Sequence, residues 1–318
     1  MDSISDFLQK TGRHLLLFGG KGGVGKTSLA SATALWAAEH ETKTLLISSD
    51  PAHSLSDIFD QDLTGGEIVT VNEISKLSVK EIETAQVAKD YQPYLDKYPE
   101  YKFILGDSLE LVPGMIDGFS VIDLNRTFNL HSDFDLIIID TAPTGHTLRF
   151  LSFPDFMKGT AMRLIQLRQK VGAFAEKLAG FFRRKKKDDE KGFDDPAEFM
   201  EKIKDWAIRT KNLLSNKKIT RFNVVTIPET LSINETSRLI NEINNYEIPM
   251  GQLLVNKIFP ISDDCEFCKA KKNIQDQELI IIQERFGQYN PIEIPFFKEE
   301  IHGIPSLRKL YKIFLPEI

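Results

Sequence analysis

The chain has 318 residues, enough for one large domain or two small ones with a sizeable core, so a disordered protein is not expected. Its composition is that of a globular protein: 42% of the residues are hydrophobic, and 40 Lys and Arg against 46 Asp and Glu give a net charge of -6. This acidic balance argues against a general nucleic-acid binder, and every apolar run is far shorter than the roughly 18 residues of a membrane span.

The first residues and the cysteine count point to a cellular compartment. Residues 1–6 carry no basic flank before an apolar stretch, as a secretion signal would, and the chain has only 2 cysteines. Neither secretion nor a disulfide scaffold is therefore indicated. We expect a cytoplasmic protein with no nucleic-acid partner.

Short apolar runs rich in β-branched residues alternate with helical stretches along the chain. Runs with little polar alternation are typical of strands buried on both faces, and their alternation with helices predicts an α/β fold with a doubly wound, mainly parallel sheet. The predicted strands are residues 15–18, 44–47, 77–82, 136–139, 222–227, 253–258 and 292–296.

Two helical stretches interrupt this alternation and indicate an inserted layer. We divide the chain into a core of residues 1–90, 122–150 and 217–318 and a helical insert of residues 91–121 and 151–216, which is not an independent domain. The insert contains a basic run, Arg183-Arg-Lys-Lys-Lys187, followed by acidic residues. A solvated linker is the simpler interpretation of this run, and contact with acidic lipid headgroups is the alternative.

A phosphate-binding loop follows the first predicted strand and precedes a predicted helix that begins near Thr27. The sequence Gly20-Lys-Gly-Gly-Val-Gly-Lys-Thr27 fits the pattern G-x-x-x-x-G-K-[ST], in which glycines let consecutive backbone N–H groups surround phosphate oxygens. Lys26 would reach the β- and γ-phosphates, and the Thr27 hydroxyl would ligate Mg²⁺. The predicted nucleotide-binding residues here are Gly20, Lys21, Gly22, Gly23, Val24, Gly25, Lys26, Thr27 and Ser28.

Lys21 is a second lysine at the start of this loop. It marks the deviant version of the motif, in which the lysine reaches the nucleotide bound by the other subunit, so it predicts a homodimer with nucleotides at the interface. Its charge would stabilise negative charge developing on the transferred phosphoryl group, as an arginine finger does elsewhere. The alternative is an ordinary exposed loop lysine.

Two further segments follow predicted strands, at the sheet edge where open α/β sheets bind ligands. The first, Ser49 to Asp57, carries Asp50 and Asp57, and the second begins at Asp140 and continues Thr-Ala-Pro-Thr-Gly-His146. A carboxylate after a strand can hold Mg²⁺, commonly through water, and a Pro- and Gly-rich loop can change conformation with the γ-phosphate. We interpret these segments as two switch loops, with Asp140 as a Mg²⁺ residue.

These motifs resemble those of the deviant P-loop ATPases, the family of arsenite-pump ATPases and of targeting factors for tail-anchored membrane proteins. The resemblance covers nearly the whole chain and is closest to the targeting factors, of the archaeal type. It implies that Asp57 positions the attacking water and that Glu229 contacts the deviant lysine of the partner subunit. It also implies that Asn256 reads the adenine and that the segment from Pro295 to Ile301 lines it.

The two cysteines form the pair Cys265-Glu-Phe-Cys268, with the spacing of a zinc knuckle. A structural Zn²⁺ needs four ligands, so a single chain supplies only half a site. In a twofold dimer a second pair would complete it, and the resemblance implies such a zinc shared between subunits. A redox dithiol and a pair of inert cysteines are the alternatives.

The helical insert is the candidate client-binding region. The resemblance implies a groove that holds one client transmembrane helix, closes when ATP draws the subunits together and opens after hydrolysis. Such a groove needs a large, adaptable apolar surface, although the same side chains could merely pack helix on helix. The predicted client-binding residues are Met157, Met162, Leu164, Leu167, Val171, Phe174 and Leu178.

Together these observations predict an ATP-, Mg²⁺- and Zn²⁺-dependent homodimeric ATPase that binds the transmembrane helices of tail-anchored proteins and delivers them to a membrane, where a receptor could meet it. The first alternative is the ATPase subunit of an arsenite or anion efflux pump. Arsenite is typically held by three thiolates, and the chain has no cysteine beyond the pair, which argues against arsenite activation. The second alternative is a holdase chaperone that works without ATP.

Overall fold

The computed structural model describes residues 3–48, 54–63, 65–82, 128–141, 205, 208–260 and 266–315. The strands are β1 (His14–Gly19), β2 (Thr44–Ser48), β3 (Val69–Thr70), β4 (Leu77–Glu81), β5 (Leu136–Asp140), β6 (Thr220–Thr226), β7 (Met250–Ile258) and β8 (Ile292–Pro295). The helices are α1 (Ile4–Leu8), α2 (Lys26–Glu39), α3 (Ser54–Phe59), α9 (Thr230–Asn245), α10 (Glu266–Phe286) and α11 (Gly303–Phe314), with the short 3₁₀ helix η2 (Gly287–Tyr289).

One sheet contains all of these strands, in the order β3-β4-β2-β5-β1-β6-β7-β8. The pairs are parallel except for the antiparallel pair of β3 and β4 at one edge. The α/β prediction and each predicted strand are confirmed. The sequence does not predict β3, because two residues are too few to produce a periodic pattern.

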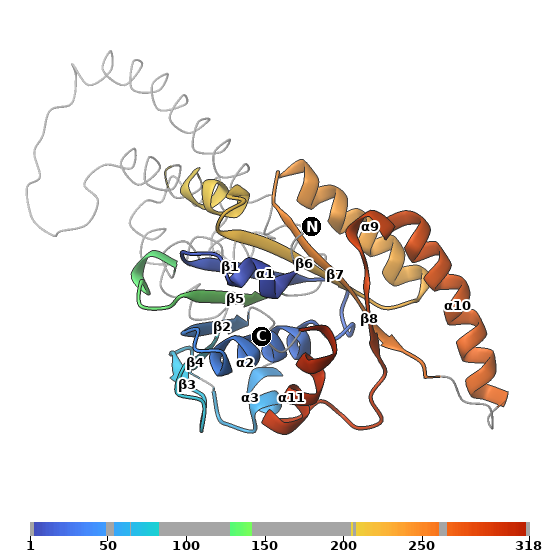
Figure 1. Ribbon diagram of the computed structural model, residues 1–318, viewed down its shortest axis with the longest axis horizontal. Helices are drawn as coiled ribbons and strands as arrows, with labels where there is room; N and C mark the ends of the chain where they lie inside the picture. The colour runs from blue at the N-terminus through green and yellow to red at the C-terminus, as the bar shows by residue number, and fades with distance from the viewer. Residues whose placement is uncertain are drawn as a thin grey trace, which may run out of the picture.

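The strands near the middle of the sheet are buried on both faces, as their sequences predict. Leu16 and Phe18 of β1 belong to a core that includes residues of α2 and α11, whereas Leu15 and Leu17 belong to a second core with residues of α9 and α10. Successive strand residues point to opposite faces, so two helical layers are needed to cover both sets of side chains. Figure 1 shows α2, α3 and α11 on one side of the sheet and α9 on the other.

The last helix, α11, is fixed against α2. Glu39, at the end of α2, accepts hydrogen bonds from Arg308 Nε at 2.6 Å and from the Tyr311 hydroxyl at 2.7 Å. Leu307 and Leu310 are buried in the core shared with α2. Because α2 begins at the phosphate loop, this packing places the segment between β8 and α11 beside that loop.

Most of the predicted helical insert lies outside the described residues, so its boundaries stay a prediction. Residues 208–215, at its end, are helical, and Leu213 and Leu214 pack into the core beneath α9. In the part of the chain that the structure describes, no helix is both long enough and apolar enough to cross a membrane.

Candidate functional site

The phosphate loop connects β1 to α2, and two of its glycines, Gly20 and Gly25, occupy positions where a side chain would clash. Gly25 has φ of 96°, in the left-handed region, and a Cβ there would lie 2.4 Å from Asn256 Nδ2. At Gly20 a Cβ would lie 2.1 Å from the backbone oxygen of Val225 in β6. The glycines therefore serve both the turn itself and the close approach of neighbouring strands.

The two lysines and the threonine of the motif lie around this turn. Lys26 is in the first turn of α2 with only 4% of its surface exposed, and its Nζ donates to the backbone oxygen of Lys21 at 3.5 Å. Lys21 and Thr27 are half-buried. Because a helix N-terminus presents unpaired N–H groups and a positive dipole end, this arrangement can hold a phosphate group.

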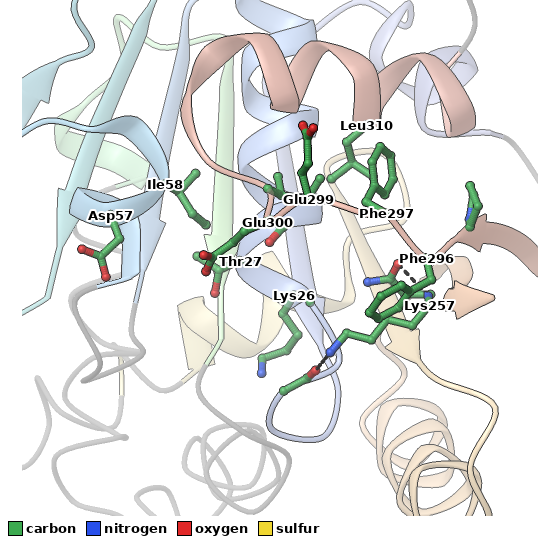
Figure 2. A pocket seen from close by; sticks show the side chains of 16 residues that line it. Lys26, Thr27, Asp57, Ile58, Lys257, Phe296, Phe297, Glu299, Glu300 and Leu310 are labelled. Carbon is green, nitrogen blue, oxygen red and sulfur yellow. Dashed lines mark hydrogen bonds between the residues drawn. The ribbon is translucent and has the colours of Figure 1, made fainter. Parts of the chain in front are cut away.

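A pocket of about 490 Å³ opens beside the loop (Figure 2). It brings together residues from five separate parts of the chain, and the loop after β8 closes its far side, as the resemblance implies for Pro295 to Ile301. Ile58 and Leu310 add apolar walls that no motif marked. The lining residues are Gly23, Gly25, Lys26, Thr27, Ser28, Asp57, Ile58, Asn256, Lys257, Pro295, Phe296, Phe297, Glu299, Glu300, Ile301 and Leu310.

Asp57 lies in the first turn of α3, with its side chain exposed at this pocket (Figure 2). The helix is fixed by a residue that the sequence analysis did not single out. Glu81, at the end of β4 and 1% exposed, accepts hydrogen bonds from Leu55 N at 2.9 Å and Ser56 N at 3.3 Å. Asp50 lies outside the described residues.

Asp140 ends β5, next to β1 and β2 in the sheet. It is fully buried and accepts a hydrogen bond from Ser48 Oγ at 3.2 Å, while the neighbouring Thr141 hydroxyl donates to Phe18 O at 2.8 Å. A carboxylate here and the Thr27 hydroxyl are oxygen ligands of the kind that Mg²⁺ prefers, so these residues fit the ion. The rest of the second switch loop, residues 142–146, lies outside the described residues.

Asn256 and Glu229 lie on neighbouring strand ends but face different cavities. Asn256 lines the pocket at the phosphate loop, whereas Glu229, exposed directly before α9, lines an adjacent cavity of about 370 Å³. The rings of Phe259 and Phe296 stack with centroids 5.4 Å apart and line this second cavity. Glu229 is thus accessible from outside the chain, as a contact with a partner subunit requires.

The predicted zinc and client residues are described only in small part. Cys268 is half-buried in the first turn of α10, and Cys265 and all seven predicted client-binding residues lie outside the described residues. Within the described ranges no group of three or more His, Cys, Asp or Glu could hold a metal ion. The described residues thus include one of the two predicted zinc ligands, and the shared zinc site stays a prediction.

The fold and this pocket define a protein of the P-loop class that binds a nucleoside triphosphate. The chain belongs to the anion-transporting ATPase family, whose sequence profile matches residues 13–316. Family membership confirms the resemblance expected from the motifs, and it makes this chain an ATPase.

Individual relatives are similar over most of their length. The ATPase ASNA1 homolog 2 of Paramecium tetraurelia is 32% identical, over 98% of this chain and 97% of that protein. The ATPase GET3B of Arabidopsis thaliana is 34% identical, over 97% and 81%. A putative arsenical pump-driving ATPase 2 of Aquifex aeolicus is 33% identical, over 95% and 99%. The relatives thus carry names from both branches of the family.

Proposed function

We propose that this ATPase is a targeting factor that shields the transmembrane helix of tail-anchored membrane proteins in the cytoplasm and delivers them to a membrane. The proposal rests on one combination of sequence features: the phosphate loop is of the deviant type, with Lys21 at its start, and the chain has only 2 cysteines. A pump ATPase activated by arsenite needs about three thiolates at its metalloid site. The pair at Cys265 and Cys268 does not supply them.

Hydrolysis would use Asp57, Lys26 and Thr27, which line the pocket, together with Asp140 and a lysine of the partner subunit. Asp57 would orient water for in-line attack on the γ-phosphate, while Lys26 and Lys21 of the partner subunit would stabilise the developing negative charge. When bound, Mg²⁺, held by Thr27 and through water by Asp140, would neutralise phosphate charge. The exposed Asp57 and the buried Lys26 line one pocket, which supports this division of roles.

Two chains together would complete the proposed nucleotide and zinc sites. Glu229 would meet the deviant lysine of the partner subunit, and the cysteine pairs of two chains would together bind one Zn²⁺. Exposed apolar side chains near Glu229 support an interface on this side, since Leu231, Ile274 and Phe296 are 59%, 59% and 45% exposed. The helical insert of residues 91–121 and 151–216 would supply the client groove.

Co-expression with a client tests the proposal. The chain is produced with a protein that bears one C-terminal transmembrane helix, and soluble complexes are separated by size-exclusion chromatography. We expect a soluble complex that is lost when the client helix is made polar. Asp57→Asn is expected to prolong the complex, because ATP hydrolysis is needed for release.

Asp60→Asn is the matched control, since Asp60 is exposed directly after α3 and does not line the pocket. A complex of ordinary lifetime is expected for this variant. If no complex forms while the wild-type protein hydrolyses ATP, the targeting proposal is wrong. Stimulation of the ATPase by arsenite in that case would favour the pump reading.

A further inference from the structure

The end of β7 departs from regular strand geometry beside the phosphate loop. The pairing of β7 with β8 shifts register between Val255 and Ile258, and Lys257 within this bulge has φ of 62°. A lysine seldom adopts the left-handed region, and such a conformation persists only where neighbouring groups hold it. The bulge therefore needs a specific support.

Gln275 of α10 supplies that support. Its Nε2 donates to the backbone oxygen of Lys257 at 3.0 Å, and its Oε1 accepts from Phe259 N at 2.6 Å. The side chain is 9% exposed. One amide thus satisfies a backbone acceptor and a backbone donor on either side of the bulge, which a regular strand partner would otherwise do.

The bulge directs two side chains at the phosphate loop. Lys257 Nζ donates to the backbone oxygen of Gly23 at 2.7 Å (Figure 2), and Asn256 Nδ2 donates to that of Val24 at 2.9 Å. Asn256 Oδ1 in turn accepts from Lys257 N at 2.9 Å. Two consecutive carbonyl oxygens of the loop are therefore fixed toward β7.

Carbonyl direction matters because a phosphate loop works by presenting N–H groups to the anion. A carbonyl turned toward a phosphate would place two negative oxygens against each other, so the loop binds well only when its carbonyls point away. Donors from neighbouring strands can hold the carbonyls in this direction before a nucleotide binds. Lys257 and Asn256 are the donors that do so for Gly23 and Val24.

We propose that Lys257 and Gln275 are positioning residues for nucleotide binding: Gln275 holds the bulge of β7, and the bulge aims Lys257 at Gly23 so that the loop is prepared for phosphate. Gln275 lines the neighbouring cavity and not the nucleotide pocket, so it acts through Lys257. This positioning role of Lys257 and Gln275 differs from the predicted contact of Asn256 with the adenine base. It does not depend on client binding.

Three variants of the full chain test whether Gln275 acts on the phosphate loop through Lys257. Lys257→Asn removes the ammonium but keeps a residue type that tolerates left-handed φ. Gln275→Glu keeps the acceptor for Phe259 N and replaces the donor to Lys257 O by an oxygen. Gln277→Glu adds the same charge at an exposed position of the same helix and serves as the matched control. Affinities for Mg-ADP are measured by calorimetry, and those for Mg-tripolyphosphate by displacement of ADP.

We expect Lys257→Asn to weaken Mg-ADP and Mg-tripolyphosphate by the same factor, about tenfold, the contribution of one charge-assisted hydrogen bond. Gln275→Glu should weaken both in the same direction, and Gln277→Glu should leave both unchanged. The double variant Lys257→Asn/Gln275→Glu should bind no more weakly than Lys257→Asn alone, because both changes interrupt one chain of contacts.

Three results would overturn the proposal. Loss of ADP affinity with retained tripolyphosphate affinity would mean that Lys257 contacts the base or ribose. Unchanged affinities would mean that the contact with Gly23 O has no influence. Additive losses of affinity in the double variant would mean that Gln275 acts independently of Lys257. Measuring the affinity for Mg-ADP is enough for this comparison. Melting temperatures of the variants identify any that fail to fold.

Discussion

At the scale of single residues, Glu81 belongs to no recognised motif but fixes the start of the helix that carries Asp57. Its buried carboxylate accepts two backbone hydrogen bonds at the start of α3. A negative charge at a helix N-terminus interacts favourably with the helix dipole, and charge-assisted hydrogen bonds are stronger than neutral ones. Since Asp57 directly follows the second of these donors, Ser56, the direction of its side chain depends on Glu81.

Replacing Glu81 by Gln tests this dependence. The amide keeps an acceptor but loses the charge, which we expect to lower kcat for ATP hydrolysis by about tenfold, or about 1.4 kcal/mol of barrier. Affinity for Mg-ADP should stay within about twofold, because α3 does not hold the phosphate loop. Steady-state kinetics and calorimetry measure the two quantities.

Glu67→Gln, at an exposed position before β3, is the control for loss of one charge and should leave kcat unchanged. An unaltered kcat for Glu81→Gln would contradict the assigned role. A parallel loss of ADP affinity would show instead that the whole pocket has loosened.

The residues of the site divide by how far their role can be foreseen from sequence. The loop from Gly20 to Thr27 is predictable because a local pattern fixes both its conformation and its chemistry. Glu81 was missed although it ends β4 as Asp140 ends β5, and the same rule about carboxylates at strand ends would have found it. Gln275 offers no such signal, because its role arises from contacts made 16 and 18 positions away in the chain.

At the scale of elements, Arg13 fixes the turn that leads into β5. Its guanidinium donates to the backbone oxygens of Phe128 at 2.6 Å, His131 at 2.7 Å and Phe134 at 2.8 Å. It also lies over the Phe128 ring, 4.2 Å from the centroid. Burial lowers the pKa of Arg13, and the charges of Asp133 and Asp135 oppose that effect. One side chain therefore joins the start of β1 to residues 128–134.

Arg13→Lys should lower the free energy of unfolding by about 2 kcal/mol, because an ammonium cannot reach three carbonyls arranged for a planar fork. Urea denaturation measures the change, and an unchanged m-value would show that the unfolded state is unaffected. Arg238→Lys is the comparison, since that exposed residue pairs with Glu235 on its own helix and should change stability by less than about 0.5 kcal/mol. Equal losses for both variants would contradict the prediction.

The elements themselves were largely readable from the sequence. Strands buried on both faces give uninterrupted apolar runs, so each long strand was predicted within a few residues of its observed bounds. The bulge of β7 was not predictable, because the polar pair Asn256 and Lys257 after an apolar run also fits the regular end of a strand. Its conformation comes from a helix that lies later in the chain, and a local pattern carries no information about that contact.

At the scale of the whole molecule, the cysteine pair predicts the zinc content of the dimer. Cys268 lies near the start of α10, and each chain can offer no more than two thiolate ligands. We expect about one zinc per two chains in freshly purified, reduced protein, measured by elemental analysis together with light scattering. Cys268→Ser should lose the metal and weaken the dimer. A reduced dimer without zinc would contradict the shared site.

The position of β1 in the sheet has a consequence for the synthesis of the protein. Its two neighbours are β5 and β6, so the ladder on its second side must wait for residues near Thr220. A ribosome adding about 5 to 20 residues per second needs about 10 to 40 s to travel from Gly19 to that point. During this time one edge of an apolar strand remains without its second partner, β6, and is exposed to aggregation. During its own synthesis the chain therefore needs β1 to be shielded from water. We propose that the finished protein gives the same kind of protection to the transmembrane helices of other proteins.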